Sequence, residues 1–423
     1  IKVMKKIIRR VSLLLLTLVA TFSTYAFSPH LDGTMMPYDF ETVDSVVPWN
    51  SDLKPVFVNY IARHGARFLS SAKKTEALKS RLEEARRQNR ITAKGIDFLN
   101  LLYRVDSVTD GHWGALNSLG IKEESRLGHE LASTVPELFK EGQVVAESSY
   151  VPRVVMTMYE FCHSLAQYSS DLEITTTEGK NLNPLLRYFT TDKPYVNYLE
   201  QGPWRYAYEA YAQAILPVNP VADMINEVVD SKELQKLSLD AYGVLQSLRA
   251  AGIDTDPAEW FTQEEYADCW KVSNLKHYYQ RSVSTFSPLP AECALPLLQR
   301  MVSNADKAFN STSLTVKPNE NTSSSSEPLK AELLFGHAET VIPLFALMKL
   351  PGCYSPDCEP DAVAAQWKDW EVSPLGANLM MVCLEDANGN DYVSLRLNGK
   401  WLEIDGKKVI PWSTLQDYWS LTH

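Results

Sequence analysis

The sequence predicts an α/β fold, in which a core with a mostly parallel central sheet flanked by helices carries a smaller, mostly helical inserted domain. Short apolar, β-branched runs alternate with longer helical patterns towards both ends of the chain, which is typical of a parallel sheet. The middle of the chain carries mainly helical patterns. A length of 423 residues fits one large domain or two unequal ones.

The first 26 residues have the layout of a secretory signal peptide. A basic stretch (residues 5–10) precedes an apolar run (residues 11–22), and small residues lead to an expected cleavage point after Ala26. An N-terminal membrane anchor is the alternative, but the run is shorter than the ~20 residues that a spanning helix needs. We therefore expect an exported protein, periplasmic or secreted, without stable membrane insertion after the signal is removed.

Charge excludes one class of partner. Removing the predicted signal peptide takes away five basic residues and no acidic ones, so the formal charge goes from −11 to −16. Binding to nucleic acid depends on neutralising phosphates with Lys and Arg, so we expect no nucleic-acid partner. If the substrate is a small polyanion, positive charge has to be concentrated in a local cleft.

The first part of the core is expected within residues 50–165. Apolar runs predict buried strands, and amphipathic or charged periodic stretches predict helices. The expected strands are 55–61 and 144–148, and the expected helices lie within 72–103, 116–132 and 153–168.

A helical insertion is expected over residues 166–285, with helical stretches at 231–251 and 262–280. The second part of the core, 286–423, begins with a strand at 332–335 and a helix at 340–350. Further along, Asn-Gly and Asp-Gly pairs separate alternating segments, which indicates antiparallel hairpins.

The cysteines and histidines give no sign of a metal site. No Cys-x-x-Cys pair occurs among the six cysteines, and the histidines outside the clusters described below lack metal-like spacing. Export permits disulfides, and Cys353 and Cys358 flank a turn that a disulfide could close. We expect neither a metal nor a cofactor.

Three polar clusters each follow a predicted strand. They are residues 63–67 (RHGAR), Arg153, and residues 337–339 (HAE). In open α/β sheets, ligands bind at the carboxyl ends of strands, so the three clusters are expected to meet at one site. Taken alone, each has an ordinary structural explanation, such as a surface ion pair or an acid in the first turn of a helix. Their shared position favours a functional site.

These residue types suit phosphoryl transfer. Arg63, Arg67 and Arg153 can surround the equatorial oxygens of a phosphoryl group with planar, permanently charged donors. An imidazole with one free nitrogen can attack phosphorus, which makes His64 the expected nucleophile. The leaving alcohol needs a proton, and Glu339 is the expected donor. His337 is interpreted as a further donor to phosphate oxygens.

The same residues carry a family resemblance. The RHGAR run resembles the RHGxR signature of the histidine phosphatase superfamily, in its acid phosphatase and phytase branch. Residues 116–120 (LNSLG) and 148–153 resemble further segments of that branch. The late HAE is similar to the variant found in multiple inositol polyphosphate phosphatases, and residues 184–189 (PLLRYF) resemble a segment of that group.

The resemblance implies a histidine-phosphatase-like core. It also implies His64 as nucleophile, Glu339 as proton donor, and phosphate binding by Arg63, Arg67, Arg153 and His337. One departure is Leu69, where the signature often has proline. This substitution bears on the shape of the loop and leaves the charges in place.

Five other cations are candidates for binding the remaining phosphates of a polyphosphorylated substrate. Lys73 and Lys74 follow the first motif closely, and Arg187, Lys193 and Arg205 lie where the insertion begins. Solvated or structural positions are the alternative for each of them.

We therefore expect an exported phosphomonoesterase that hydrolyses inositol polyphosphates through a phosphohistidine intermediate. A broad-specificity acid or sugar phosphatase remains a close alternative. A mutase of the same superfamily is disfavoured by the signal peptide, because glycolytic mutases work in the cytoplasm. A non-catalytic phosphate-binding protein is disfavoured by the presence of both His64 and Glu339.

Overall fold

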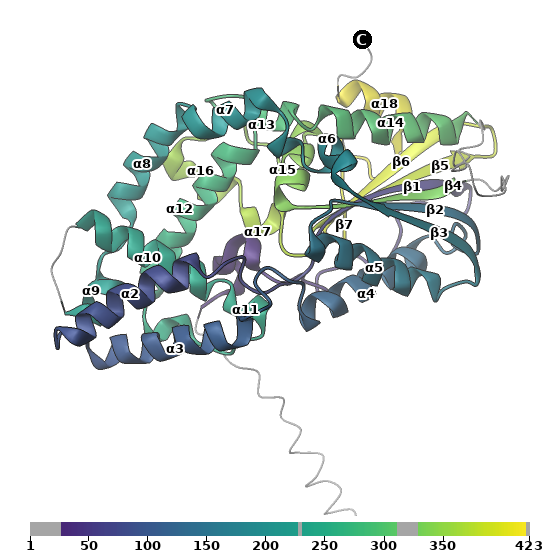
Figure 1. The fold of residues 1–423 in the computed structure, drawn as a ribbon. Helices are drawn as coiled ribbons and strands as arrows, with labels where there is room; N and C mark the ends of the chain where they lie inside the picture. The colour runs from purple at the N-terminus through teal and green to yellow at the C-terminus, as the bar shows by residue number, and fades with distance from the viewer. Residues whose placement is uncertain (1–26, 227–230, 311–328, 420–423) are drawn as a thin grey trace, which may run out of the picture.

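The computed structural model describes residues 27–226, 231–310 and 329–419, so the predicted signal peptide lies outside the described residues. Within them, strands form a single sheet, shown at the right of Figure 1. They are β1 (Leu53–Arg63), β2 (Glu141–Ser148), β3 (Asp171–Glu178), β4 (Leu329–Gly336), β5 (Asn378–Asp386), β6 (Asp391–Leu397), β7 (Lys400–Trp401) and β8 (Ile410–Pro411).

The sheet has a parallel half and an antiparallel half. Its order is β3-β2-β4-β1-β5-β6-β7, with β8 paired to β6. Strands β3, β2, β4 and β1 run parallel, and β5 joins β1 antiparallel. The predicted hairpins follow: Asn398 and Gly399 both have positive φ between β6 and β7, as a tight two-residue turn requires. Strands β1, β2 and β4 are neighbours, so their carboxyl ends lie together.

The helices are α2 (Lys73–Arg87), α3 (Ala93–Thr109), α4 (Ser118–Thr134), α5 (Pro152–Ala166), α6 (Asn183–Leu186), α7 (Lys193–Gln201), α8 (Trp204–Ile215), α9 (Asn219–Ile225), α10 (Ser231–Leu245), α11 (Leu248–Ala251), α12 (Gln263–Arg281), α13 (Leu289–Glu292), α14 (Leu295–Phe309), α15 (Ala338–Leu347), α16 (Pro360–Gln366), α17 (Asp369–Val372) and α18 (Trp412–Tyr418). Short 3-10 segments are η1 (Pro29–Met35), η2 (Lys180–Leu182), η3 (Tyr188–Thr190) and η4 (Pro257–Glu259).

Both faces of the sheet are covered, which explains the mostly apolar character of β1, in which Asn59 is a buried polar exception. Phe57 and Ile61 point into a core shared with α14 and α15. Val58, Tyr60 and Ala62 point into the opposite core, shared with α4 and α5. Alternate side chains of a strand face opposite sides, so a strand between two helical layers has to be apolar throughout. The predicted α/β class, with a central sheet flanked by helices, is confirmed.

A separate helical part packs beside the sheet, on the left of Figure 1. It has its own apolar core, built from α2, α3, α9, α10 and α12. Helices α2 and α3 belong to the segment that we assigned to the first part of the core, yet they pack against α10 and α9. The chain therefore contributes to the helical part before residue 166 as well as after it.

Two local predictions differ from the structure. The helical stretch expected over 72–103 is two helices, with Asn89 at positive φ between them and Thr92 capping the second. Strand β3 was not predicted and lies in the segment assigned to the helical insertion. It is an edge strand whose outer residues are largely exposed, so its sequence lacks the continuous apolar run of β1.

The segment before β1 joins the two parts. Asp32 in η1 is buried and accepts hydrogen bonds from Arg249 Nε (2.8 Å) and Tyr266 OH (3.2 Å), both in the helical part. Further along, Tyr38 N donates to Glu123 of α4 (3.0 Å). This segment therefore links α11 and α12 with the layer beneath the sheet.

The six cysteines are buried free thiols, Cys353 and Cys358 among them. Among the described residues, no helix is long and apolar enough to cross a membrane.

Candidate active site

The first cluster forms the loop that leaves β1. His64 is buried, and its Nδ1 lies 3.0 Å from the carbonyl oxygen of Gly65. A carbonyl only accepts, so this contact assigns the proton to Nδ1 and leaves Nε2 unprotonated. Burial lowers the pKa of His64 well below its ordinary value, and Arg153, Arg63 and Arg67 act in the same direction. The imidazole is therefore neutral and able to act as a nucleophile.

Helix α4 holds this loop in place. Glu123 accepts a hydrogen bond from the backbone N–H of Ala66 (2.8 Å). Gly65 and Gly120 allow close approach: a Cβ on Gly120 would lie 2.2 Å from the carbonyl oxygen of Ala66. Gly65 has no positive φ, so its role is close packing.

Arg63 and Arg67 flank His64 in the sequence. Arg63 Nη1 donates to the carbonyl oxygens of Thr34 (2.5 Å) and Ser373 (2.7 Å), which fixes its guanidinium. Burial lowers the pKa of Arg63 to about 9, and the charge of Arg67 adds to this effect. Crowded positive charge of this kind favours the binding of an anion.

The other two clusters meet at His337, which caps α15. The His337 ring lies 5.9 Å from the His64 ring, centroid to centroid. Ser149 Oγ lies 3.0 Å from His337 Nε2, and Arg153 Nη2 lies 3.4 Å from Nδ1. Burial lowers the pKa of His337 to about 3; Glu339 opposes this effect and Arg153 reinforces it. The three strand ends thus bring their polar residues together as expected.

Arg187 also belongs to this cluster. Its Nη1 lies 3.4 Å from His337 Nε2. The segment is tied to α15, because Thr340 Oγ1 donates to the carbonyl oxygen of Leu186 (2.7 Å) and Tyr188 OH donates to that of Thr340 (2.6 Å). Arg187 is therefore nearer to the catalytic cluster than an outer contact would be.

The arginines around His64 and His337 have N–H groups that can donate hydrogen bonds to an anion. The buried Nε–H groups of Arg63, Arg67, Arg153 and Arg187 have no hydrogen-bond partner among the described residues. Buried donors without acceptors cost free energy, so a ligand that supplies oxygen acceptors near them is favoured.

Glu339 lies in the first turn of α15, and its side chain is 36% exposed. Its Oε1 accepts a hydrogen bond from Arg281 Nη2 of α12 (2.7 Å). Burial raises the pKa of Glu339, but Arg281, His337 and Arg63 outweigh that effect, so the pKa lies well below its ordinary value. In the free protein Glu339 is a carboxylate.

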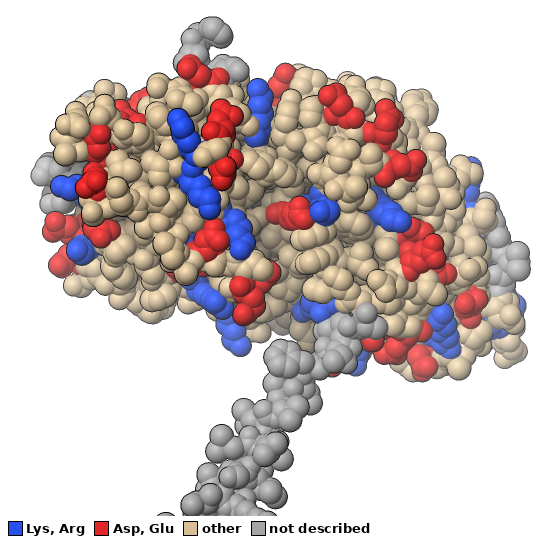
Figure 2. Space-filling view, turned by 180° about the vertical axis from the view of Figure 1, so that it is seen from behind, with Lys and Arg blue, Asp and Glu red and all other residues tan. Residues whose placement is uncertain are grey.

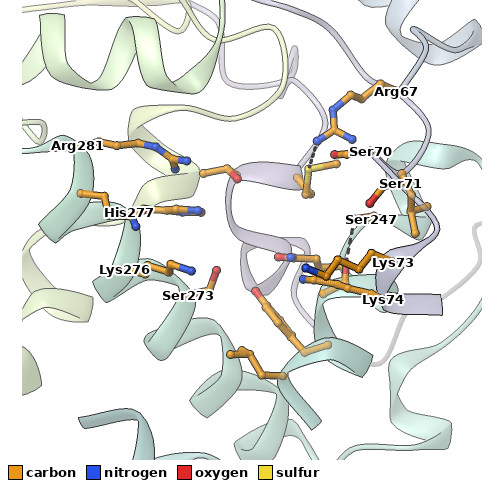
Figure 3. A pocket seen from close by; sticks show the side chains of 18 of the residues that line it. Arg67, Ser70, Ser71, Lys73, Lys74, Ser247, Ser273, Lys276, His277 and Arg281 are labelled. Atoms are coloured by element: carbon orange, nitrogen blue, oxygen red, sulfur yellow. Dashed lines mark hydrogen bonds between the residues drawn. The ribbon is translucent and has the colours of Figure 1, made fainter. Parts of the chain in front are cut away.

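A cavity of about 420 Å³ lies next to this cluster, between the loop after β1 and the helical part. Figure 3 shows Arg281, His277 and Lys276 on one side of it and Arg67, Lys73 and Lys74 on the other. Among the described residues that line it, none is acidic. Positive charge is thus concentrated locally, whereas both signs are interspersed on the face shown in Figure 2.

The outer cations proposed from the sequence divide into two groups. Lys73, Lys74 and Arg187 lie at the cavity or the catalytic cluster. Lys193 is exposed at the start of α7, and Arg205 is exposed and donates to the carbonyl oxygen of Glu200. Neither of these two lines the cavity, because α12 and not α7 or the start of α8 provides that wall.

Sequence reasoning missed three residues of α12. Lys276, His277 and Arg281 line the cavity, and none of them was proposed from the sequence. The expected helix 262–280 contains Lys276 and His277 and ends one residue before Arg281, and the i, i+4 spacing of His277 and Arg281 was the available signal. A basic helix face is usually solvated, so the pattern gave no reason to place it at the site.

Within the part of the chain that the structure describes, no group of three or more His, Cys, Asp or Glu side chains is placed to hold a metal ion.

A family model decides the identity. The model of the histidine phosphatase superfamily, branch 2, matches residues 56–398. The chain belongs to this family. It is a histidine-type phosphatase and hydrolyses phosphomonoesters.

Solved structures share the fold of this histidine phosphatase. The multiple inositol polyphosphate phosphatase of Bifidobacterium longum, in complex with inositol hexasulfate, has a TM-score of 0.73 at 15% identity, covering 92% of this chain and 97% of that one. The phytase from D. castellii has a TM-score of 0.63 at 15% identity, covering 93% and 84%. Hafnia alvei phytase with myo-inositol hexakis sulphate has a TM-score of 0.52 at 14% identity, covering 88% and 98%. Among curated protein sequences, no match is found.

Proposed function

We propose that this histidine phosphatase hydrolyses inositol polyphosphates, with inositol hexakisphosphate as the favoured substrate, and that it acts after export to the periplasm or beyond. The observation that carries the substrate class is the cavity beside His64. Its described lining holds Arg67, Lys73, Lys74, Lys276 and Arg281 and no carboxylate. A monophosphate is neutralised by the catalytic arginines alone, so these additional cations suit a substrate with several phosphates.

In the proposed mechanism, His64 Nε2 attacks phosphorus in line with the leaving oxygen. The P–O bond to the inositol breaks, a P–N bond to His64 forms, and protonated Glu339 gives its proton to the leaving oxygen. Arg63, Arg67 and Arg153 donate to the equatorial oxygens, where the charge of the transition state is spread. Water then attacks the phosphohistidine, and the Glu339 carboxylate accepts its proton. The products are inorganic phosphate and an inositol with one phosphate fewer.

The test is phosphate release from inositol hexakisphosphate, sugar phosphates and 4-nitrophenyl phosphate. We expect the highest kcat/KM with the hexakisphosphate, and an acid-labile phosphoenzyme at His64 after rapid quench. His64→Ala should remove both the turnover and the phosphoenzyme while the protein keeps its circular dichroism spectrum.

Two outcomes would contradict separate parts of the proposal. Equal kcat/KM for all the esters would indicate a broad-specificity acid phosphatase and would leave the phosphohistidine mechanism in place. Near-normal turnover by folded His64→Ala protein would exclude His64 as the nucleophile.

A further inference from the structure

Arg281, on helix α12, contacts Glu339, the proposed general acid. Arg281 is the last residue of the helix, and its Nη2 donates to Glu339 Oε1 at 2.7 Å. One turn earlier, His277 Nδ1 contacts the carboxylate of Asp369 at 2.7 Å, and this carboxylate is buried. Trp270 Nε1 also donates to Asp369 (3.1 Å). These contacts tie α12 to Asp369 of α17, with the His277 contact one turn before Arg281.

This pairing is at odds with the role of a proton donor. A general acid has to carry its proton when the leaving group departs. The charged and titratable groups that act on Glu339 come from every element around it, and the charged ones are cations. They are Arg281 and His277 on α12, Arg63 on β1, Arg67 in the following loop, Arg153 on α5, His337 beside it, and the phenols of Tyr188 and Tyr195. In the free protein, the cations among these groups, with Arg281 acting most strongly, keep Glu339 ionised.

Arg281 also lines the cavity, together with Lys276 and Lys74. Its side chain is 14% exposed and borders the space that a second phosphate would occupy. A phosphate carries more charge than a carboxylate and competes for the same N–H donors. Once Arg281 turns to the phosphate, Glu339 loses its ion-pair partner and gains an anionic neighbour. Both changes favour uptake of a proton from water.

We propose that Arg281 is a positioning residue that couples occupancy of the cavity to protonation of Glu339, so that a second phosphate on the substrate arms the general acid. The identity of that second phosphate rests on the proposed function. The coupling itself requires only a polyanion in the cavity. Substrates with several phosphates are then expected to have a higher kcat as well as tighter binding. When a monophosphate binds, Glu339 stays paired with Arg281 and ionised.

The direct test is infrared difference spectroscopy with inositol hexasulfate, a polyanion used here in place of the phosphate ester. In the wild-type protein near pH ~6, we expect the carboxylic-acid band of one protonated side chain to appear on binding. Glu339→Gln should remove this band. In Arg281→Gln without ligand, the band should appear at a higher pH than in the ligand-free wild type, because removing the arginine raises the pKa of Glu339.

The kinetic test uses the pH dependence of kcat/KM with glycerol 2-phosphate, a monophosphate with a poor leaving group. In Arg281→Gln we expect the alkaline limb to move up by about one to three pH units. With 4-nitrophenyl phosphate, whose leaving group needs no acid, the limb should stay in place. Lys276→Gln is the matched control: it removes a neighbouring cavity cation on the same helix, so it should raise KM for inositol hexakisphosphate without moving the limb.

The outcomes separate this proposal from the proposed function. No carboxylic-acid band on binding of the hexasulfate to wild-type protein, or an unmoved limb in folded Arg281→Gln, would overturn the coupling. Arg281→Lys keeps the charge and provides a second variant if the glutamine variant does not fold; its limb should stay near that of the wild type. Failure to hydrolyse inositol hexakisphosphate would overturn the substrate class alone, because the infrared and glycerol phosphate measurements do not depend on it.

Discussion

His64 and Glu339 illustrate how the environment of single residues separates two roles. Both sit in the same field of arginine charge, and that field favours the uncharged form of an imidazole and the charged form of a carboxylate. A neutral imidazole suits a nucleophile at any mildly acidic pH. A carboxylate suits the base that activates water in the second step. Only the first step, in which the leaving group departs, requires Glu339 to be protonated.

The role of Glu339 as donor can be tested through the leaving group. Glu339→Gln should slow hydrolysis of inositol hexakisphosphate or glycerol 2-phosphate by roughly 100-fold or more, because proton transfer typically contributes that much. Hydrolysis of 4-nitrophenyl phosphate should slow less, since nitrophenolate leaves without a proton. Steady-state kcat for these esters is the measurement. A similar loss on both kinds of ester would indicate that Glu339 only positions the substrate.

At the scale of elements, the beginning of α4 determines the shape of the nucleophile loop. Asn117 caps this helix by accepting from the N–H groups of Leu119 (3.1 Å) and Gly120 (3.0 Å). Gly120 then packs directly on the backbone of Ala66. The loop that carries His64 is thus held by the backbone of a helix, and a single methyl group at this contact would displace it.

Gly120→Ala should therefore lower both stability and kcat. We expect a loss of about 1–3 kcal/mol in the free energy of unfolding, the usual cost of inserting a methyl group into a packed contact. The matched control is Gly128→Ala on the same helix, where a Cβ would lie 2.4 Å from the carbonyl oxygen of Phe161. It should lower stability similarly and leave kcat per folded molecule unchanged. Equal effects on kcat would indicate that Gly120 matters for folding alone.

At the scale of the whole molecule, the distribution of charge has a measurable consequence. The full chain has a formal charge of −11, yet the described lining of the cavity holds five Lys and Arg side chains and no acid. The net charge repels a polyanion at long range, and the cavity attracts it at short range. Salt screens both effects, but the Debye length at about 0.1 M, roughly 10 Å, leaves mainly the local attraction.

We therefore expect kcat/KM for inositol hexakisphosphate to fall about tenfold as sodium chloride rises from about 0.1 M to about 0.5 M. The value for 4-nitrophenyl phosphate should change far less, because that substrate needs few cavity cations. The measurement is initial rates at substrate concentrations well below KM. Parallel salt dependence for the two substrates would contradict a role of the cavity in binding.

The sequence by itself determined the strands that carry the proposed catalytic residues. Runs such as 55–61 are apolar because both of their faces are covered, and this demand is visible in local composition. The sequence also indicated that residues 63–67, Arg153 and residues 337–339 lie at one site. The carboxyl ends of neighbouring parallel strands lie at the same edge of a sheet, whatever path the chain takes between the strands. Strand β3 was not predicted, because an edge strand that is largely exposed does not need a continuous apolar sequence.

Only the tertiary structure decided which distant cations join the site. Arg281 contacts Glu339 from a helix that His277 and Trp270 tie to Asp369, and no local pattern encodes that contact. Lys193 and Arg205 looked equally suitable in sequence, but neither side chain lines the cavity. Whether the basic face of a helix points to solvent or into a cavity depends on how its apolar face packs. That packing involves residues far apart in the chain.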